Sequence, residues 1–407
     1  MISSVSPQRR RRTSGVVTLD QAAPARLAIL CDIVEENWPS MDLVAEMLFR
    51  SLQRDHADSF AATLLAPSMR RRLTRVASES RHFFNADRLL NRFWDYQRWL
   101  RSRTQEFDLF HVIDHSYGQL LHHLPPARTI VTCHDLDTFR SLIDPQAEPR
   151  SRLFQKMMRN VLSGFQKAAL VACDSEATRD ELLAHKLIAP ERLRVVPLGV
   201  HPSCSLEANP AADSEARRYL GEGPENSINL LHVGSTIKRK RIDVLLETLA
   251  GLRKEFPQAC LIRVGGPFTP AQVDQARRLD LENAIVVLPH LSREVLAAVY
   301  RQADLVLQPS DAEGFGLPVI EAMACGTPVI ASDLPVLREV GGEAASYVPV
   351  SEVPAWTEAI NWLLQEREQQ PEKWAARKAA GITQAAKFSW AEYARKMVGL
   401  YDEVLAG

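Results

Sequence analysis

The sequence predicts an α/β protein built from two doubly wound parallel sheets that face each other across a cleft. The chain has 407 residues, which is enough for two or three domains. From Ala25 onward, short apolar runs alternate with amphipathic stretches, and this rhythm breaks between 201 and 227 and then restarts. Such alternation is typical of parallel sheets flanked by helices, and these sheets bind ligands at the carboxyl ends of their strands. The cleft between the halves is therefore the expected active site.

The first half contains six expected strands, which are short, apolar and bounded by turn formers. They cover 26–33, 60–67, 107–115, 128–137, 169–175 and 192–200. Apolar residues at helical spacing predict a helix over 40–55 and a longer one over 86–103. On the longer helix one apolar stripe is expected, with Trp94 and Trp99 beside it. This stripe consists of Leu89, Phe93, Tyr96 and Leu100.

The second half repeats the pattern. Its expected strands cover 228–234, 260–266, 284–289, 304–310, 327–333 and 346–350, with a helix over 241–256. A final helix over 388–405 is expected to bury one stripe, formed by Trp390, Ala394, Met397 and Tyr401. The predicted domains are a disordered basic tail (1–24), an N-terminal Rossmann-like domain (25–203), a linker with room for a short helix (204–227), a C-terminal Rossmann-like domain (228–387) and the final helix (388–407).

The composition excludes several classes of protein. The net formal charge of -1 argues against a dedicated nucleic-acid binder. No apolar run reaches the ~18 residues that a membrane-spanning helix needs. Four arginines at 9–12 are not followed by the apolar segment of a secretory signal. The six cysteines are scattered without zinc-ligand spacing, which favours free thiols and a cytoplasmic protein.

The charge is unevenly distributed along the chain. Residues 69–103 hold ten arginines and three acidic residues, a balance of +7. One interpretation is an amphipathic helix with a solvated basic face. The other is peripheral contact with an anionic membrane at its inner face.

The segment 309–333 carries the most specific motif. A strand ends at Pro309, and a glycine-containing loop leads into a helix that begins near Pro318. The exposed amides of such a loop and helix start form an anion site. Glu313 on the loop and Glu321 inside the helix can both accept hydrogen bonds from sugar hydroxyls. Together these groups suit a ligand that carries a diphosphate and several hydroxyls.

Two further segments follow expected strands. In 232–247 a basic loop presents Arg239 and Lys240, natural counter-charges for a diphosphate. His134 comes directly after a buried strand, which places it at the cleft. Asp135 adjoins it and could orient the ring or bind the acceptor. The pair Asp135 and Asp137 also imitates a metal-binding Asp-x-Asp, an interpretation that we set aside because the rest of the chain has a different pattern.

The string 309–333 resembles the Glu-x7-Glu signature of the retaining glycosyltransferases of family 4. The resemblance runs from about 26 to 405 and implies the GT-B fold, with two Rossmann-like domains facing a cleft and a C-terminal helix that crosses back to the N-terminal domain. It implies that the N-terminal domain (25–203) binds the acceptor and that the C-terminal domain (228–387) binds the nucleotide-sugar donor. It implies that Glu313 binds hydroxyls of the donor sugar and that Glu321 binds the ribose hydroxyls. The loop residues implied to line the sugar and phosphate are Gly314, Phe315, Gly316 and Leu317.

The resemblance also assigns roles in the other segments. The basic loop looks like the family's G-x4-RK element, so Gly234, Ser235, Arg239 and Lys240 are implied to bind the diphosphate. His134 matches a histidine that contacts the transferred sugar. The residues expected at the acceptor are Asp135, His115 and Tyr117.

The chain departs from the family pattern at two places. Some members carry an arginine directly after the first glycine of the basic loop, where this chain has Ser235, so that charge is either missing or supplied by Lys238 or Arg241. Many members have a glycine pair after the first strand, and the segment 35–42 has no glycine. The acceptor site is expected to differ there.

The expected function is retaining transfer of a sugar from a nucleotide-diphosphate sugar to a glycan or lipid-linked acceptor, in polysaccharide or glycoconjugate biosynthesis. The donor is a substrate, and neither cofactor nor metal is expected. Two alternatives remain open at this point. One is a sugar-nucleotide epimerase on the same fold, and the other is a non-catalytic nucleotide-sugar-binding protein.

Overall fold

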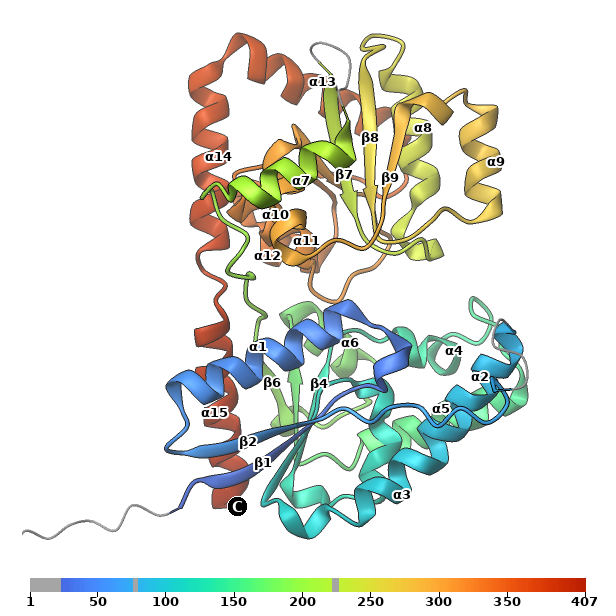
Figure 1. The fold of residues 1–407 in the computed structure, drawn as a ribbon, viewed down its shortest axis with the longest axis vertical. Helices are drawn as coiled ribbons and strands as arrows, with labels where there is room; N and C mark the ends of the chain where they lie inside the picture. The colour runs from blue at the N-terminus through green and yellow to red at the C-terminus, as the bar shows by residue number, and fades with distance from the viewer. Residues whose placement is uncertain (1–22, 76–79, 222–226) are drawn as a thin grey trace, which may run out of the picture.

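A computed structural model describes residues 23–75, 80–221 and 227–407. The expected basic tail lies almost entirely outside the described residues. Figure 1 shows two lobes, one above the other, each built around a parallel sheet with helices on both faces. The predicted pair of doubly wound sheets is confirmed.

The first sheet has the strand order β2-β1-β3-β4-β5-β6 and is parallel throughout. Its strands are β1 (Ala25–Leu30), β2 (Phe60–Leu65), β3 (Leu109–Val112), β4 (Thr129–Cys133), β5 (Leu170–Cys173) and β6 (Leu193–Val195). The last expected strand, 192–200, is much shorter in the structure. Its pairing ends at the Val196 N–H, which donates to the Cys173 carbonyl oxygen at 2.8 Å. The next residue, Pro197, has no N–H with which to continue the ladder.

The second sheet has the order β12-β11-β10-β7-β8-β9. Its strands are β7 (Ile228–Val233), β8 (Ala259–Val264), β9 (Ile285–Leu288), β10 (Leu305–Gln308), β11 (Val329–Ser332) and β12 (Ser346–Val348). The strand order reverses between β7 and β10, which are hydrogen-bonded neighbours. The loops after these two strands therefore leave the sheet side by side, at the kind of switch point where such folds bind ligands.

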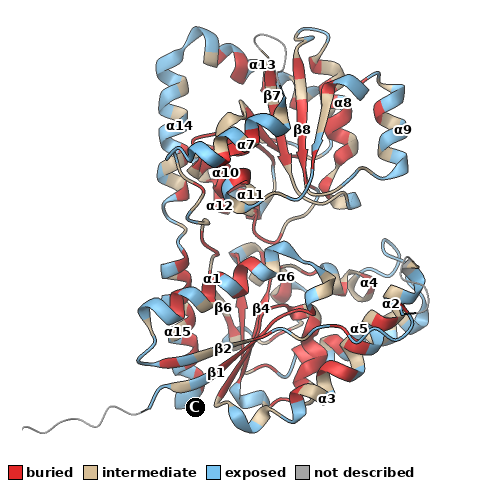
Figure 2. Cartoon of the chain, viewed as in Figure 1, coloured by how far each residue is buried: buried red, intermediate tan, exposed pale blue. Residues whose placement is uncertain are grey.

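Helices cover both faces of each sheet, and the central strands are buried, whereas the edge strands β2 and β9 are partly exposed (Figure 2). In the first lobe they are α1 (Pro39–Asp55), α2 (Arg81–Leu90), α3 (Tyr96–Arg101), α4 (Arg140–Ile143), α5 (Arg152–Phe165) and α6 (Glu176–Ala184). In the second lobe they are α7 (Pro210–Leu220), α8 (Ile242–Leu252), α9 (Pro270–Arg278), α10 (Arg293–Gln302), α11 (Leu317–Ala324), α12 (Pro335–Gly341), α13 (Val353–Gln369) and α14 (Pro371–Ala385).

Much of the expected linker is a helix of the second lobe. α7 begins at Pro210. The preceding residue, Asn209, is its N-cap, and the Asn209 side chain accepts a hydrogen bond from the Ala212 N–H. α7 packs against α10, and Asp213 forms an ion pair with Arg301 at 2.6 Å. The chain therefore crosses between the lobes before α7, and the helix within 204–227 packs on the second lobe.

The last helix, α15 (Trp390–Ala406), crosses back to the first lobe (Figure 1). All four residues of its expected stripe are buried. Tyr401 bonds the ring of His111 on β3 at 2.8 Å, and Arg194 pairs with Glu403. The predicted crossing helix is confirmed.

The helix expected over 86–103 does not keep its stripe. A π-helical turn at 91–95 separates α2 from α3, and the extra residue in this turn rotates the faces of the two helices relative to each other. Tyr96 and Leu100 are buried, whereas Leu89 is exposed and Trp94 is 64% exposed. The prediction of one continuous stripe was therefore wrong at its N-terminal end.

Candidate functional site

The two motifs of the second lobe meet at one carboxylate. Glu313 lies on the loop between β10 and α11, and Lys240 lies in the 3-10 turn 238–240 after β7. The Nζ of Lys240 donates to both Glu313 oxygens, at 2.6 and 2.8 Å. Gln308 and Ser310 also donate to Oε1. Burial opposes ionisation of Glu313, but Lys240 and Arg239 hold its pKa below the ordinary value.

Arg239 connects the two lobes. Its Nη1 lies 3.4 Å from Glu313 Oε2 in its own lobe. Across the cleft its Nη2 lies 3.4 Å from Asp135 Oδ2, and its Nε lies 2.6 Å from Asp137 Oδ2. The Asp-x-Asp pair after β4 is thus engaged by an arginine. Arg239, which the sequence predicts as a partner of the diphosphate, therefore pairs with three carboxylates in this structure.

His134 is held by groups of its own lobe. Its Nδ1 donates to Asp174 Oδ2 at 2.5 Å, and its Nε2 donates to the Ile113 carbonyl at 2.8 Å. Both partners are acceptors, so both ring nitrogens carry protons and the ring is charged. Burial opposes that charge, but Asp174 raises the pKa of His134 to about 9. Neither nitrogen is left to contact a sugar in this conformation.

Asp174, rather than the expected Asp135, orients the His134 ring. The register of the first sheet explains this pairing, because Cys133 at the end of β4 lies opposite Cys173 at the end of β5. The next residue on each strand is therefore His134 and Asp174. Sequence reasoning missed Asp174, although it follows an expected strand just as His134 does.

The switch point of the first sheet holds carboxylates that the sequence did not single out. Asp32 follows β1, and Asp114 follows the neighbouring β3. Asp32 is 5% exposed, and neither of its oxygens has a hydrogen-bond partner among the described residues. Burial, and then the charge of Asp114, raises the pKa of Asp32 well above its ordinary value. Asp32 and Asp114 are therefore two buried carboxyl groups close enough to each other and to His134 to interact electrostatically.

The three residues expected at the acceptor differ in position. His115 is buried, 3.9 Å from Asp135 and 3.5 Å from Asp114, and within the described chain its ring nitrogens have no hydrogen-bond partner. Tyr117 is a core residue instead. Its hydroxyl accepts from the Ile33 N–H at 3.1 Å, and Arg92 stacks on its ring. The prediction of Tyr117 as an acceptor contact was wrong, because the 3-10 segment 115–122 turns its ring inward.

The second glutamate of the motif is buried inside the second lobe. Glu321 Oε2 accepts from the Tyr300 hydroxyl at 3.0 Å, and Oε1 lies 3.9 Å from Arg293. Burial raises the pKa of Glu321. Arg293 also donates to the Pro39 carbonyl of the first lobe at 2.9 Å, so it spans the cleft beside the motif.

Between the two glutamates the loop packs tightly on the first lobe. A Cβ on Gly314 would lie 1.8 Å from the His134 carbonyl oxygen, so only glycine fits there. Gly316 has a φ of +101° and caps α11. In the described chain the N–H groups of Phe315, Gly316 and Leu317 have no hydrogen-bond partner. They are free to bind an anion at the start of α11.

The departures from the family pattern have structural answers. Arg241 is tied to Asp243 and Asp311 at 2.7 and 2.9 Å, and Lys238 is exposed, so neither replaces the charge absent at Ser235. After β1 the chain turns without glycine because Asn37 takes the left-handed conformation, with φ 50°. Asparagine tolerates that conformation better than most residues.

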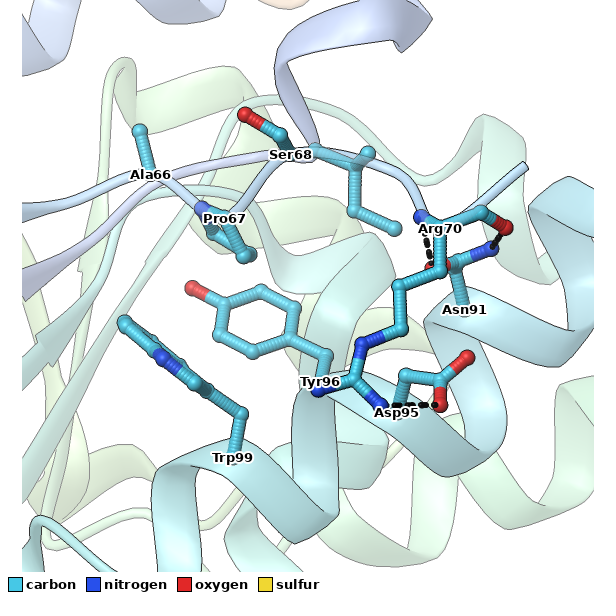
Figure 3. A pocket seen from close by; sticks show the side chains of 9 residues that line it. Ala66, Pro67, Ser68, Arg70, Asn91, Asp95, Tyr96 and Trp99 are labelled. Carbon is cyan, nitrogen blue, oxygen red and sulfur yellow. Dashed lines mark hydrogen bonds and ion pairs between the residues drawn. The ribbon is translucent and has the colours of Figure 1, made fainter.

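A separate cavity of about 360 Å³ opens on the first lobe, beside Asp32's neighbour Ile33 (Figure 3). Tyr96 and Trp99 form one wall, and the segment 66–68 forms the other. At one end, Asn91 binds the backbone of Arg70 at 2.7 and 3.0 Å. The Arg70 guanidinium lies 3.8 Å from Asp95 Oδ1, and its side chain is 69% exposed (Figure 3).

The comparisons with known proteins agree with this architecture. The model of Glycosyl transferases group 1 matches residues 217–380, and the model of Glycosyltransferase Family 4 matches residues 44–203. A D-inositol 3-phosphate glycosyltransferase of Corynebacterium glutamicum is 30% identical over 324 residues, which is 75% of this chain and 74% of that protein. One of Thermobispora bispora is 34% identical over 231 residues, 53% of this chain and 51% of that protein.

Solved structures share the fold. Sucrose-phosphate synthase of Thermosynechococcus elongatus aligns with a TM-score of 0.72 at 19% identity, covering 94% of this chain and 99% of that one. HepE of Anabaena, solved with UDP and glucose, aligns with a TM-score of 0.71 at 18% identity, covering 93% and 100%. The chain is a glycosyltransferase of the GT-B fold and belongs to family 4.

Proposed function

We propose that the protein transfers a sugar from a nucleotide-diphosphate sugar to an acceptor hydroxyl, with retention at the anomeric carbon. The observation that carries this proposal is the meeting of Arg239, Lys240 and Glu313 beside the free amides that start α11. The two cations and the amides suit a diphosphate, whereas the carboxylate suits sugar hydroxyls. No other part of the described cleft combines these features.

In the proposed reaction the bond between the anomeric carbon and the diphosphate oxygen breaks, and the bond to the acceptor oxygen forms on the same face. The proton of the acceptor hydroxyl passes to the leaving diphosphate. Negative charge grows on that diphosphate, and Arg239, Lys240 and the charged ring of His134 offset it. Glu313 holds the sugar by its hydroxyls, and Glu321 holds the ribose.

Donor binding requires exchange of ion pairs. Arg239 must release Asp135 and Asp137, and the ammonium group of Lys240 must contact the diphosphate as well as Glu313. Because these two aspartates are engaged by Arg239, we do not place a metal on them, and we expect transfer to continue in the presence of EDTA. Loss of transfer on chelation would contradict this.

The acceptor is proposed to bind at the carboxyl ends of β1 and β3. Asp32 has two unpartnered oxygens there, and carboxylates accept hydrogen bonds from hydroxyls. The relatives named D-inositol 3-phosphate glycosyltransferase make that phosphorylated polyol one acceptor to test. A glycan or lipid-linked acceptor, as in polysaccharide or glycoconjugate biosynthesis, is the other class.

Peripheral contact with an anionic membrane at the cytoplasmic face is proposed for the arm formed by 69–75 and 80–103. Within the described residues no helix is long and apolar enough to cross a bilayer. The arm exposes apolar side chains near its arginines, which is how surface-bound helices attach to anionic lipid. These apolar residues are Leu73, Phe83, Leu89, Leu90 and Trp94.

The experiment for the donor is a calorimetric panel of UDP-, GDP- and ADP-sugars, with UDP-glucose first because HepE has been solved with it. Binding of one series, weakened by Lys240→Ala and Glu321→Ala, is expected. Turnover with an acceptor and retained anomeric configuration would then exclude the binding-only and epimerase alternatives. No binding of any series to the wild-type protein would overturn the proposal.

The membrane contact is tested with vesicles. The wild-type chain is expected to sediment with phosphatidylglycerol vesicles and not with phosphatidylcholine vesicles. Trp94→Ser should weaken sedimentation. Trp362→Ser is the matched control, because Trp362 is 53% exposed on α13 of the other lobe. Equal sedimentation of the two variants would overturn the role of the arm.

A further inference from the structure

Arg263 is a buried arginine that the proposed mechanism does not use. It lies near the carboxyl end of β8, and its side chain is fully buried. Its Nη1 donates to the Gly234 and Val264 carbonyls at 2.6 and 2.7 Å and lies 2.9 Å from His232 Nδ1. In the described chain its Nε and Nη2 have no hydrogen-bond partner.

No carboxylate of the described residues forms an ion pair with Arg263, and burial lowers its pKa to about 10. The guanidinium therefore remains protonated at neutral pH. A buried charge without a counter-charge is costly, and native structures rarely keep one without a partner or a function. His232 does not supply the missing negative charge, because burial and the neighbouring cations hold its pKa well below the ordinary value and the ring is neutral.

The position of Arg263 connects it with the donor loop. Gly234, whose carbonyl it binds, is the first residue of the loop that leads to Arg239 and Lys240. A Cβ on Gly234 would lie 3.3 Å from the His232 ring and 3.6 Å from Lys240 Cε. Arg263, His232 and Lys240 therefore form one neighbourhood beneath the loop, and two of its three members are cations.

We propose that Arg263 is a buried counter-charge for the donor's diphosphate and a positioning residue for the Gly234 loop. It supplies from the sheet the positive charge that Ser235 does not supply from the loop. The counter-ion missing from the free protein is the diphosphate itself, which arrives above the loop. This inference rests on the proposed function, because it requires a nucleoside-diphosphate donor.

The test compares ligands of different charge. For the base that the wild-type chain prefers, affinities of the nucleoside, its monophosphate and its diphosphate are measured by calorimetry with wild type and Arg263→Met. Loss of a buried charge should weaken the diphosphate about tenfold, the monophosphate less and the nucleoside hardly at all, because the Coulomb energy scales with ligand charge. A role in overall folding alone would weaken all three equally.

Two further variants keep the test decisive. Arg263→Gln retains amide donors for the carbonyls and is used if the methionine variant does not fold. Arg263→Lys retains the charge and should preserve most of the preference for the diphosphate. Arg253→Met is the matched control, since Arg253 donates to the Ala259 carbonyl at the opposite end of β8 and should leave all three affinities unchanged.

The outcomes separate the two proposals. If the wild-type chain binds no nucleoside diphosphate, the proposed function fails. If it binds one and the Arg263 variants lose all three ligands equally, or lose none, the donor site stands and the role of Arg263 is overturned.

Discussion

The carboxyl edges of the two sheets face the same cleft but carry opposite charge. The edge of the second sheet is cationic at its switch point, with Arg239, Lys240 and the buried Arg263. The edge of the first sheet is acidic, and its carboxylates follow four different strand ends or the loops beside them. These are Asp32, Asp114, Asp135, Asp137 and Asp174.

The two edges also differ in how their charges are satisfied. Glu313 accepts hydrogen bonds from four side chains, those of Arg239, Lys240, Gln308 and Ser310. Asp32 has no hydrogen-bond partner among the described residues. A diphosphate needs cations, whereas an acceptor needs groups that take hydrogen bonds from hydroxyls. The difference supports the proposal that the donor binds at the second sheet and the acceptor at the first, and four experiments probe the two edges.

The largest effect is expected at Lys240, on the cationic edge. Lys240→Ala removes a charge that offsets the leaving diphosphate, so kcat/KM should fall by about 10²- to 10³-fold. Steady-state kinetics with the donor identified by binding measures this loss. Lys238→Ala, which removes an exposed charge two residues away, is the control. Equal effects of the two substitutions would contradict a specific role for Lys240.

On the acidic edge, the His134–Asp174 pair should give the protein a pH-dependent stability. The pKa of His134 is about 9 in the folded protein and 6.5 when unperturbed. The stabilisation is complete below about pH 6.5 and is lost as pH rises through 9, by on the order of 3 kcal/mol. Asp174→Asn should flatten that slope in urea unfolding at pH 6.5 and 9.

The control for this pH prediction is Asp180→Asn, on the following helix α6. Asp180 is 63% exposed and pairs only with Arg179 at the surface, so its loss should leave the slope unchanged. A wild-type free energy of unfolding that does not fall between the two pH values would contradict a charged His134.

Asp32→Asn tests the acceptor assignment. The KM for the acceptor should rise by up to about tenfold, as expected for losing a hydrogen bond that a buried carboxyl group accepts from the acceptor hydroxyl, while donor affinity stays unchanged. The thermal midpoint should not fall, because the carboxylate makes no hydrogen bond with the described residues. Weaker donor binding with an unchanged acceptor KM would show that Asp32 contributes to donor binding and not to acceptor binding. Asp58→Asn, on the surface before β2, is the control.

The smallest effect is expected where the two edges touch. The double variant Asp135→Asn, Asp137→Asn frees Arg239 from the first lobe, so donor affinity should increase by about two- to fivefold, as for other partly exposed ion pairs. Calorimetry at low and high salt measures this, and the gain should shrink as salt rises. A loss of donor affinity would mean that the aspartates assist donor binding.

Much of the second lobe's site could be predicted from the sequence, because its residues are close together in the chain. Glu313 and Glu321 sit on one loop and one helix, and Arg239 and Lys240 sit in one turn. A motif of this kind indicates local geometry, because the spacing of its residues determines which of them lie together at the N-terminus of a helix. The residues at the strand ends of the first lobe are far apart in the chain, so no short motif indicates which of them lie together.

Tertiary structure decided which side chains pair. His134 and Asp174 are forty residues apart, and only the register of β4 with β5 brings them together. The inward turn of Tyr117 and the exposed Trp94 depend on a 3-10 segment and a π turn, which apolar periodicity does not encode.

The sequence by itself determined the two sheets, the crossing helix and the loops that bear the cations, because hydrophobic periodicity and short motifs are local properties. The tertiary structure alone decided that Asp135 and Asp137 hold Arg239, that Asp32 is left without a partner and that Arg263 lies under the donor loop. Electrostatic pairing depends on distances of a few ångströms between residues far apart in the chain. Such distances are set only when the strands align and the lobes meet.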